Sequence, residues 1–135
     1  MSSTDGPLVL YVEDEPMIQE LGVSTLHEAG FAVAACATGE EALSELDAKG
    51  ADIRVLVTDI DLPGGMTGWE VATRARQAFS TLPVIYVSGG SADEWTAMGV
   101  PGSTMVVKPY APAQLVVAVS TALQGAPIGI APDGA

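Results

Sequence analysis

Acidic, hydroxyl and ammonium side chains follow short apolar runs in this sequence, and together they could carry out phosphoryl transfer. Three acids, Glu13–Glu15, follow the first run, and Asp59 follows the third. Ser88 ends the fourth run and Lys108 follows the fifth. A carboxylate can accept a phosphoryl group, while an ammonium group and a hydroxyl can stabilise the phosphoryl oxygens. One acid of this kind is usually a loop or helix cap, so the inference depends on all four groups meeting.

The run of acids also predicts a divalent cation. Three neighbouring carboxylates repel one another, and a cation among them removes that cost. Mg²⁺ prefers oxygen ligands and keeps several of its waters when it is bound to carboxylates. We therefore expect Glu13–Glu15 and Asp59 to share a Mg²⁺ site.

Five apolar runs supply the elements that must bring these groups together. They are rich in Val, Ile and Leu and do not alternate with polar residues, which is typical of strands covered on both faces in a parallel sheet. The predicted strands are Leu8–Val12, Phe31–Ala35, Val55–Thr58, Val84–Ser88 and Thr104–Val107.

Helical signals fill the segments between these runs. In the first helix the apolar positions repeat with a 3.6-residue period at Met17, Ile18, Leu21, Thr25 and Leu26. Ser91 and Glu94 have capping-box spacing for a fourth helix, which Gly99 and Pro101 keep short. The predicted helices are Pro16 to near Gly30, Gly39–Ala48, Trp69–Phe79, the short one after Ser91, and Pro112–Leu123.

The alternation of strands and helices predicts an α/β fold, a (βα)5 doubly wound sheet of five parallel strands. In such sheets binding sites form at the carboxyl ends of the strands, where the polar groups named above are expected. The chain has 135 residues, which suits one domain over 7–124 with an N-terminal arm at 1–6. Residues 125–135 are rich in Gly, Pro and Ala, so we expect a flexible tail there.

Composition excludes several classes of function. A formal net charge of −12 disfavours direct binding to nucleic acid. No apolar run approaches the roughly 20 residues that cross a bilayer, and no signal peptide is evident, so no membrane partner is expected. The one cysteine, Cys36, is expected to be a small buried residue. These features together predict a cytoplasmic protein.

Four segments, in this order, resemble the response regulator receiver domain, whose fold is CheY-like and flavodoxin-like. The similarity covers about residues 7–124 and is carried by Tyr11–Pro16, Val57–Pro63, Tyr86–Gly89 and Val106–Tyr110. It implies a two-component or phosphorelay protein whose partner is a histidine kinase or a histidine phosphotransfer protein. It also implies a cis peptide before Pro109.

The resemblance assigns a role to each site residue. Asp59 looks like the phosphoacceptor, and Ser88 and Lys108 would contact the phosphoryl oxygens. The metal is expected to be Mg²⁺. Its expected ligands are the carboxylates of Asp14 and Asp59, the backbone carbonyl of Asp61, and Glu13 acting through water.

The chain departs from the receiver pattern near its expected switch. Met105 stands where the family usually has an aromatic switch residue, so Met105 and Tyr110 are the switch candidates. The loop Leu62–Gly68 is one residue longer than usual. Lys108-Pro109-Tyr110 partly resembles an alphaproteobacterial subgroup that has a Phe-Ala-Thr-Gly-x-Tyr run and Lys-Pro-Tyr.

Function beyond phosphorylation stays open at this stage. With no effector domain expected, the output is a downstream protein partner, a phosphoryl relay or a phosphate sink, and the only catalysis expected is self-phosphorylation and autodephosphorylation. The Asp59-Ile60-Asp61 spacing also resembles haloacid dehalogenase-type phosphatases, which need acids after their lysine, where this chain has only Asp133. His27-Glu28 resembles a phosphotransfer histidine, which requires a helical bundle, and a receiver-like binding module is a further alternative.

Overall fold

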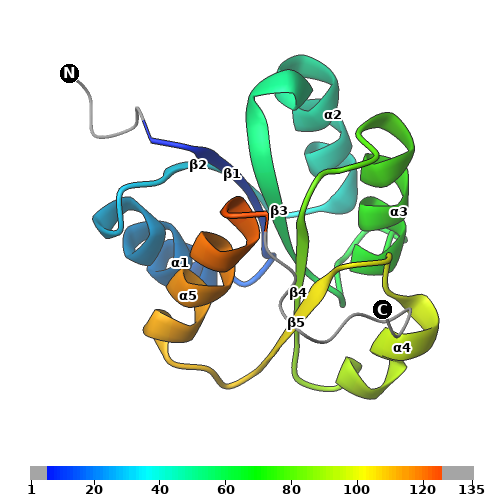
Figure 1. The fold of residues 1–135 in the computed structure, drawn as a ribbon. Coiled ribbons are helices and arrows are strands. Elements are labelled where there is room, and N and C mark those ends of the chain that lie inside the picture. Colours follow the sequence, from blue (N-terminus) through cyan, green and yellow to red (C-terminus); the bar gives the residue numbers. More distant parts are fainter. Residues whose placement is uncertain (1–5, 126–135) are drawn as a thin grey trace.

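A single parallel sheet forms the centre of the computed structural model, which describes residues 6–125. The strand order is β2-β1-β3-β4-β5, and every neighbouring pair is parallel (Figure 1). The strands are β1 (Leu8–Val12), β2 (Ala32–Cys36), β3 (Ile53–Asp59), β4 (Val84–Ser88) and β5 (Thr104–Val107). The α/β fold predicted from the alternating pattern is confirmed.

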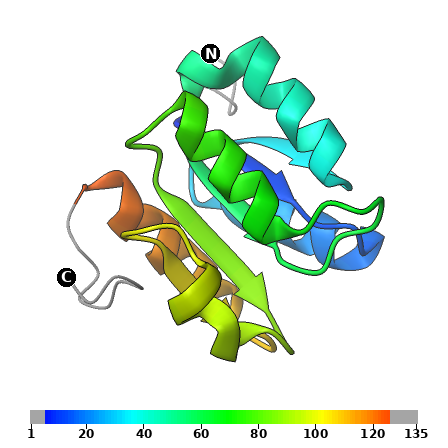
Figure 2. The ribbon, with the colours of Figure 1, turned by 90° about the vertical axis from the view of Figure 1, so that its right-hand side faces the viewer.

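Helices cover both faces of this sheet (Figure 2). α1 (Pro16–Glu28) and α5 (Pro112–Leu123) contact each other on one face, and α2 (Gly39–Lys49) and α3 (Gly68–Ala78) pair on the other. α4 (Trp95–Met98) is a single turn that follows the 3-10 turn Ala92–Glu94. Each strand therefore buries side chains on both sides, which is why the strand sequences lack polar alternation.

Two apolar clusters, one on each face, hold these layers together. The cluster under α2 and α3 contains Leu10, Leu56 and Tyr86, and the ring of Tyr86 packs against Trp69 with centroids 4.7 Å apart. The cluster under α1 and α5 contains Tyr11 and Leu115. Cys36 is buried as expected. The sheet edge that carries the polar groups therefore rests on a packed core on both faces.

Several predicted boundaries need correction. β2 begins and ends one residue later than predicted, and β3 is longer at both ends. The capping box expected at Ser91 and Glu94 is wrong, because Glu94 N–H bonds to the Ser91 backbone carbonyl. A capping box is instead formed at the start of α3, where Thr67 and Glu70 bond reciprocally.

The apolar stripe of α1 faces the core less completely than its period predicts. Gly22 lies so close to Tyr11 that an added Cβ would be 2.3 Å from the tyrosine hydroxyl. This approach turns the Ile18, Gly22 and Leu26 side of the helix inward. Met17 and Leu21 are consequently 79% and 58% exposed rather than buried.

Two predicted segments cannot be compared with the structure in full. Residues 1–5 of the predicted N-terminal arm (1–6) and residues 126–135 of the predicted tail (125–135) lie outside the described residues. Between residues 6 and 125, none of the helices is both long enough and apolar enough to cross a membrane.

Candidate functional site

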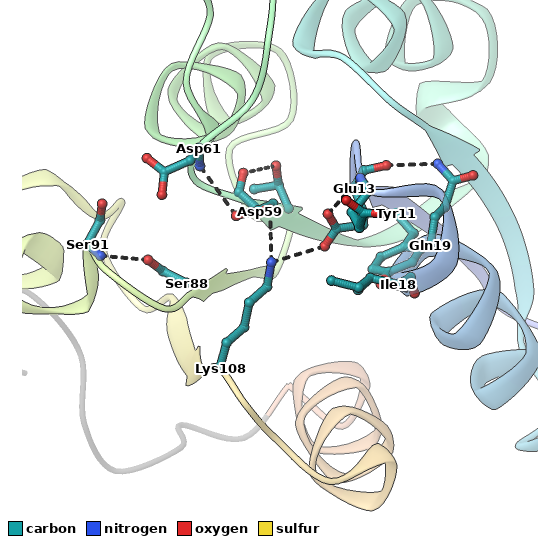
Figure 3. Close-up of polar contacts among 11 residues, drawn as sticks. Tyr11, Glu13, Ile18, Gln19, Asp59, Asp61, Ser88, Ser91 and Lys108 are labelled. Carbon is teal, nitrogen blue, oxygen red and sulfur yellow. Dashed lines mark hydrogen bonds and ion pairs between the residues drawn. The ribbon is translucent and has the colours of Figure 1, made fainter.

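The carboxyl ends of β1, β3, β4 and β5 bring the predicted polar groups to one place (Figure 3). Lys108 Nζ lies 3.0 Å from Asp59 Oδ2 and 3.3 Å from Glu13 Oε1. These contacts join residues that are 49 and 95 positions apart in the sequence. The parallel sheet is therefore sufficient to assemble an acid–lysine–acid group from three separate strand ends.

Glu13 is held in place by its own loop and by a residue that sequence analysis did not single out. Its carboxylate accepts a hydrogen bond of 3.1 Å from the backbone N–H of Glu15. The Gln19 side-chain amide donates to the carbonyls of Glu13, at 3.0 Å, and Cys36, at 2.9 Å. Gln19 thus ties the ends of β1 and β2 together beneath the acids, a role that no sequence spacing indicates.

Asp59 ends β3 within a close-packed turn. The backbone N–H of Asp61 donates to Asp59 Oδ1 at 3.3 Å, while the Asp61 side chain is exposed. The Thr58 hydroxyl donates to the Asp59 carbonyl at 2.8 Å. A Cβ on Gly68 would lie 2.2 Å from that same carbonyl oxygen, so only glycine lets α3 begin this close to the acceptor. Gly68 is a second residue that the sequence reasoning missed.

The carboxylates of Glu13, Asp14 and Asp59 fit a divalent cation. One oxygen from each lies within 4.8 Å of the others. Glu13 and Asp59 are only 2% and 6% exposed, whereas Asp14 faces solvent. All donors are oxygens, the set that Mg²⁺ prefers, and the exposed Asp14 leaves room for the waters that Mg²⁺ keeps. Of the acids predicted to share the metal site, Glu13, Asp14 and Asp59 are therefore brought together, and Glu15 is not part of the group.

Burial, neighbouring charges and hydrogen bonds together shift the pKa values of Glu13 and Lys108. Burial raises the pKa of Glu13, and the charge of Asp59 adds to that rise, while the Glu15 N–H and Lys108 act against it. Partial burial works to lower the pKa of Lys108, but its hydrogen bond to Asp59 and the charges of both acids raise it overall. Lys108 is therefore firmly protonated, and it is the cation that keeps Glu13 ionisable inside the protein.

The remaining predicted residues surround this centre. Ser88 is fully buried, and its Oγ accepts a 2.8 Å hydrogen bond from the Ser91 backbone N–H, on the side of Asp59 away from Glu13 (Figure 3). Met105 is half-buried against the cluster that contains Tyr86. Tyr110 is half-buried beside Tyr11 in the opposite cluster. The peptide bond between Lys108 and Pro109 is cis, as expected.

Comparison with known proteins agrees with this geometry. The family model described as the response regulator receiver domain matches residues 9–120. The chain belongs to the response regulator receiver family. Receiver domains of this family act in two-component signalling, and phosphorylation and Mg²⁺ binding at an acidic cluster are standard among them.

Relatives of several kinds share this receiver domain. Sensory transduction protein RegX3 of Mycobacterium tuberculosis is 34% identical over 118 residues, covering 86% of this chain and 50% of its own length. Chemotaxis protein CheY1 of Helicobacter pylori is 33% identical over 109 residues, covering 77% and 86%. A response regulator receiver protein from Sinorhizobium medicae has a solved structure with 39% identity, a TM-score of 0.84, and coverage of 89% and 96%. The chain spans about half the length of the first of these relatives.

Proposed function

We propose that Asp59 accepts a phosphoryl group from a phosphohistidine in a partner protein, with Mg²⁺ held by Glu13, Asp14 and Asp59. The observation that carries the proposal is the 3.0 Å contact between Lys108 Nζ and Asp59 Oδ2 beside a buried second acid. A carboxylate that is paired with an ammonium group and flanked by metal-binding oxygens can act as a nucleophile toward phosphorus.

The transfer needs no other base. An Asp59 carboxylate oxygen forms the new P–O bond while the P–N bond to the donor imidazole breaks, and the imidazole nitrogen keeps that electron pair and takes a proton from solvent. Lys108 can exchange the carboxylate for the new phosphoryl oxygens at little cost in free energy, because its ammonium group donates charge-assisted hydrogen bonds to either acceptor. Bound Mg²⁺ would neutralise the charge on the transferring group.

The signal starts at Ser88. In the unphosphorylated chain its Oγ accepts a hydrogen bond from Ser91 N–H. Donation of the Ser88 hydroxyl to a phosphoryl oxygen draws it toward Asp59 and weakens that contact, which frees the segment leading to α4. This segment includes Gly89 and Gly90, whose backbones are easily rearranged. Movement there, and at the switch candidates Met105 and Tyr110, gives a conformational output.

This chain has an apolar surface next to the site on which the donor protein can dock. A groove of about 430 Å³ lies between α1 and the segment that follows β5, and its lining includes Ile18, Leu21, Tyr110 and the stem of Lys108. Since Lys108 borders both this groove and Asp59, a protein seated here could present a phosphohistidine to the acceptor. The exposure of Met17 and Leu21 extends the same surface.

Phosphorylation is tested with a small phosphodonor. The chain is incubated with acetyl phosphate and Mg²⁺, and intact-mass spectrometry is expected to show the addition of one phosphoryl group. Asp59→Asn and chelation of Mg²⁺ are each expected to abolish the addition. Full labelling of Asp59→Asn would contradict the assignment of the acceptor.

Donor docking is tested separately. Leu21→Glu is expected to slow transfer from a phosphorylated histidine phosphotransfer protein by roughly tenfold or more, since one buried interface contact is worth more than about 1.4 kcal/mol. Labelling by acetyl phosphate is expected to be unchanged. Val117→Glu, which adds the same charge at an exposed apolar position of α5 outside this groove, is the control. An equal loss in both variants would show that net charge, rather than the α1 surface, governs the transfer.

A further inference from the structure

The surface formed by α4, β5 and α5 carries almost no charge, although the chain has a formal net charge of −12. From Trp95 to Gly125 the only charged residue is Lys108, and its ammonium group is bonded to Asp59 and Glu13. On this neutral face Val107 and Val117 are 53% and 62% exposed. Contiguous apolar surface on an otherwise acidic protein marks a place where something binds.

A groove runs along this neutral face. It measures about 540 Å³, lies between β5 and α5, and is lined by Met105, Val107 and Val117 among others. β5 is the last strand of the sheet, so one of its edges has no strand partner among residues 6–125. Proteins usually cover or charge such an edge, because an open apolar edge pairs with other chains. Charge is absent here, which favours a cover.

We propose that residues 126–132 of the same chain cover this groove. Their sequence is Ala-Pro-Ile-Gly-Ile-Ala-Pro, which contains no charge and two large apolar side chains, and only Gln124 and Gly125 separate it from α5. Composition alone predicts a flexible tail for this part of the chain, and the groove offers an apolar surface to which that tail can bind.

The end of α5 directs the chain toward the groove. Gly125 has a φ of 72°, the left-handed conformation that ends a helix and reverses the chain, and its N–H bonds to the Ala122 carbonyl. The groove extends along α5 from Ala113 to Thr121, roughly 12 Å at the rise of a helix. Seven extended residues span roughly 23 Å, so residues 126–132 can reach along its whole length.

The spacing of the two isoleucines suits this path. In an extended segment residues two apart point to the same side, so Ile128 and Ile130 can both enter the groove while Gly129 and Ala131 face outward. Pro127 and Pro132 favour extended backbone in the residues that precede them. Because the segment is tethered, its effective concentration is of millimolar order, whereas a second copy must overcome the repulsion of two strongly acidic chains.

Hydrogen exchange on the unphosphorylated protein tests this proposal without depending on Asp59 chemistry. The full chain is compared with a variant that ends at Gly125. Removal of a cap that is in place about 90% of the time is expected to raise exchange rates in β5 and the exposed side of α5 on the order of tenfold. Ile130→Asp is expected to have the same effect, and Ala131→Asp, which adds the same charge facing outward, is expected to have none. Unchanged exchange in the shortened chain, or equal effects of the two Asp variants, would overturn the proposal.

A disulfide distinguishes the chain's own segment from a second copy. In a Val117→Cys/Ile130→Cys variant, with Cys36 replaced by Ala, mild oxidation is expected to give a monomeric cross-link whose yield does not depend on protein concentration. A variant that pairs Ile130→Cys with Ala78→Cys, at the end of α3, is the control and is expected not to cross-link. Predominantly dimeric cross-links from Val117→Cys/Ile130→Cys would assign the groove to a second copy and refute capping within one chain.

Discussion

Lys108 is expected to stabilise the metal-free protein strongly, and Lys108→Met tests this. The methionine keeps most of the aliphatic stem but removes the ammonium group that contacts Glu13 and Asp59. Both acids are almost fully buried, so the substitution leaves two carboxylates close together without a cation. Breaking a buried ion pair in this way typically costs about 3–5 kcal/mol.

Protonation of Glu13 limits the part of this cost that comes from repulsion between the two carboxylates. Glu13 can escape the repulsion by taking a proton, and at pH 7 this requires only the free energy that separates pH 7 from its ordinary pKa of 4.5. At about 1.36 kcal/mol for each pH unit the limit is about 3.4 kcal/mol. We therefore expect Lys108→Met to lower the free energy of unfolding by about 2–3.4 kcal/mol at pH 7 in a chelating buffer.

The dependence on pH follows from the same carboxyl group. Without Lys108 the folded-state pKa of Glu13 rises further, so the variant is penalised above that pKa and relieved as the pH falls through it. The deficit relative to the parent is expected to shrink toward pH 5. Mg²⁺ is expected to stabilise the variant more than the parent, because the added cation replaces the missing charge.

Urea unfolding followed by tryptophan fluorescence measures these differences. Lys49→Met is the matched control, since it removes the same charge from an exposed pair with Glu45 at 3.2 Å and is expected to cost at most about 0.5 kcal/mol. If Lys108→Met unfolds at the same urea concentration as Lys49→Met, or if its deficit does not shrink at lower pH, the electrostatic account of the site is wrong.

Further predictions concern three other residues. Asp14→Ala is expected to weaken Mg²⁺ binding at least about tenfold by calorimetry, because a carboxylate is lost from the cluster, and unchanged affinity would remove Asp14 from the ligand set. Gly68→Ala is expected to destabilise the fold by about 1–3 kcal/mol and to slow phosphorylation, because its Cβ meets the Asp59 carbonyl, whereas Gly90→Ala, with open space around it, is expected to do neither. Burial, with the nearby acids, raises the pKa of Cys36 to about 11, so a thiol reagent at pH 8 is expected to label it slowly unless urea is present. Because the unfolded thiol ionises first, stability is expected to fall between about pH 9 and 11 in the parent and less in Cys36→Ala.

The main features of the fold could be read from the sequence because parallel sheets obey simple rules. Uninterrupted apolar runs identify strands that are buried on both faces, and parallel pairing places all their carboxyl ends together. The contact of Lys108 with Asp59 and Glu13 was therefore predictable, although 49 and 95 residues separate the partners.

Details that depend on how closely a helix approaches the sheet, or on hydrogen bonds to backbone carbonyls, could not be predicted in this way. The period of α1 predicts Met17 and Leu21 in the core, but the close approach of Gly22 to Tyr11 rotates them outward. The prediction of a capping box at Ser91 was wrong because a 3-10 turn begins there. In that turn the Glu94 N–H bonds to the Ser91 backbone carbonyl rather than to its side chain. Gln19 was missed because its partners are main-chain carbonyls, which leave no trace in the sequence.

Under the proposed function, the charges at the sheet edge give a physical reason why phosphorylation is expected to move a distant segment. Glu13, Asp14 and Asp59 face a single ammonium group, so three acids against one lysine leave an excess of two negative charges, which one divalent cation balances. Conversion of the Asp59 carboxylate to an acyl phosphate brings the charge of that group to about −2 and adds three acceptor oxygens. Lys108 already donates to this side chain, so the added acceptors need a new donor, and the buried hydroxyl of Ser88 is the one at the neighbouring strand end. Ser91 N–H donates to the oxygen of this hydroxyl at 2.8 Å, so a movement of Ser88 toward the phosphoryl oxygens would stretch that hydrogen bond. Under the proposed function, the same electrostatic demand that completes the site is therefore expected to loosen the chain that leads to α4.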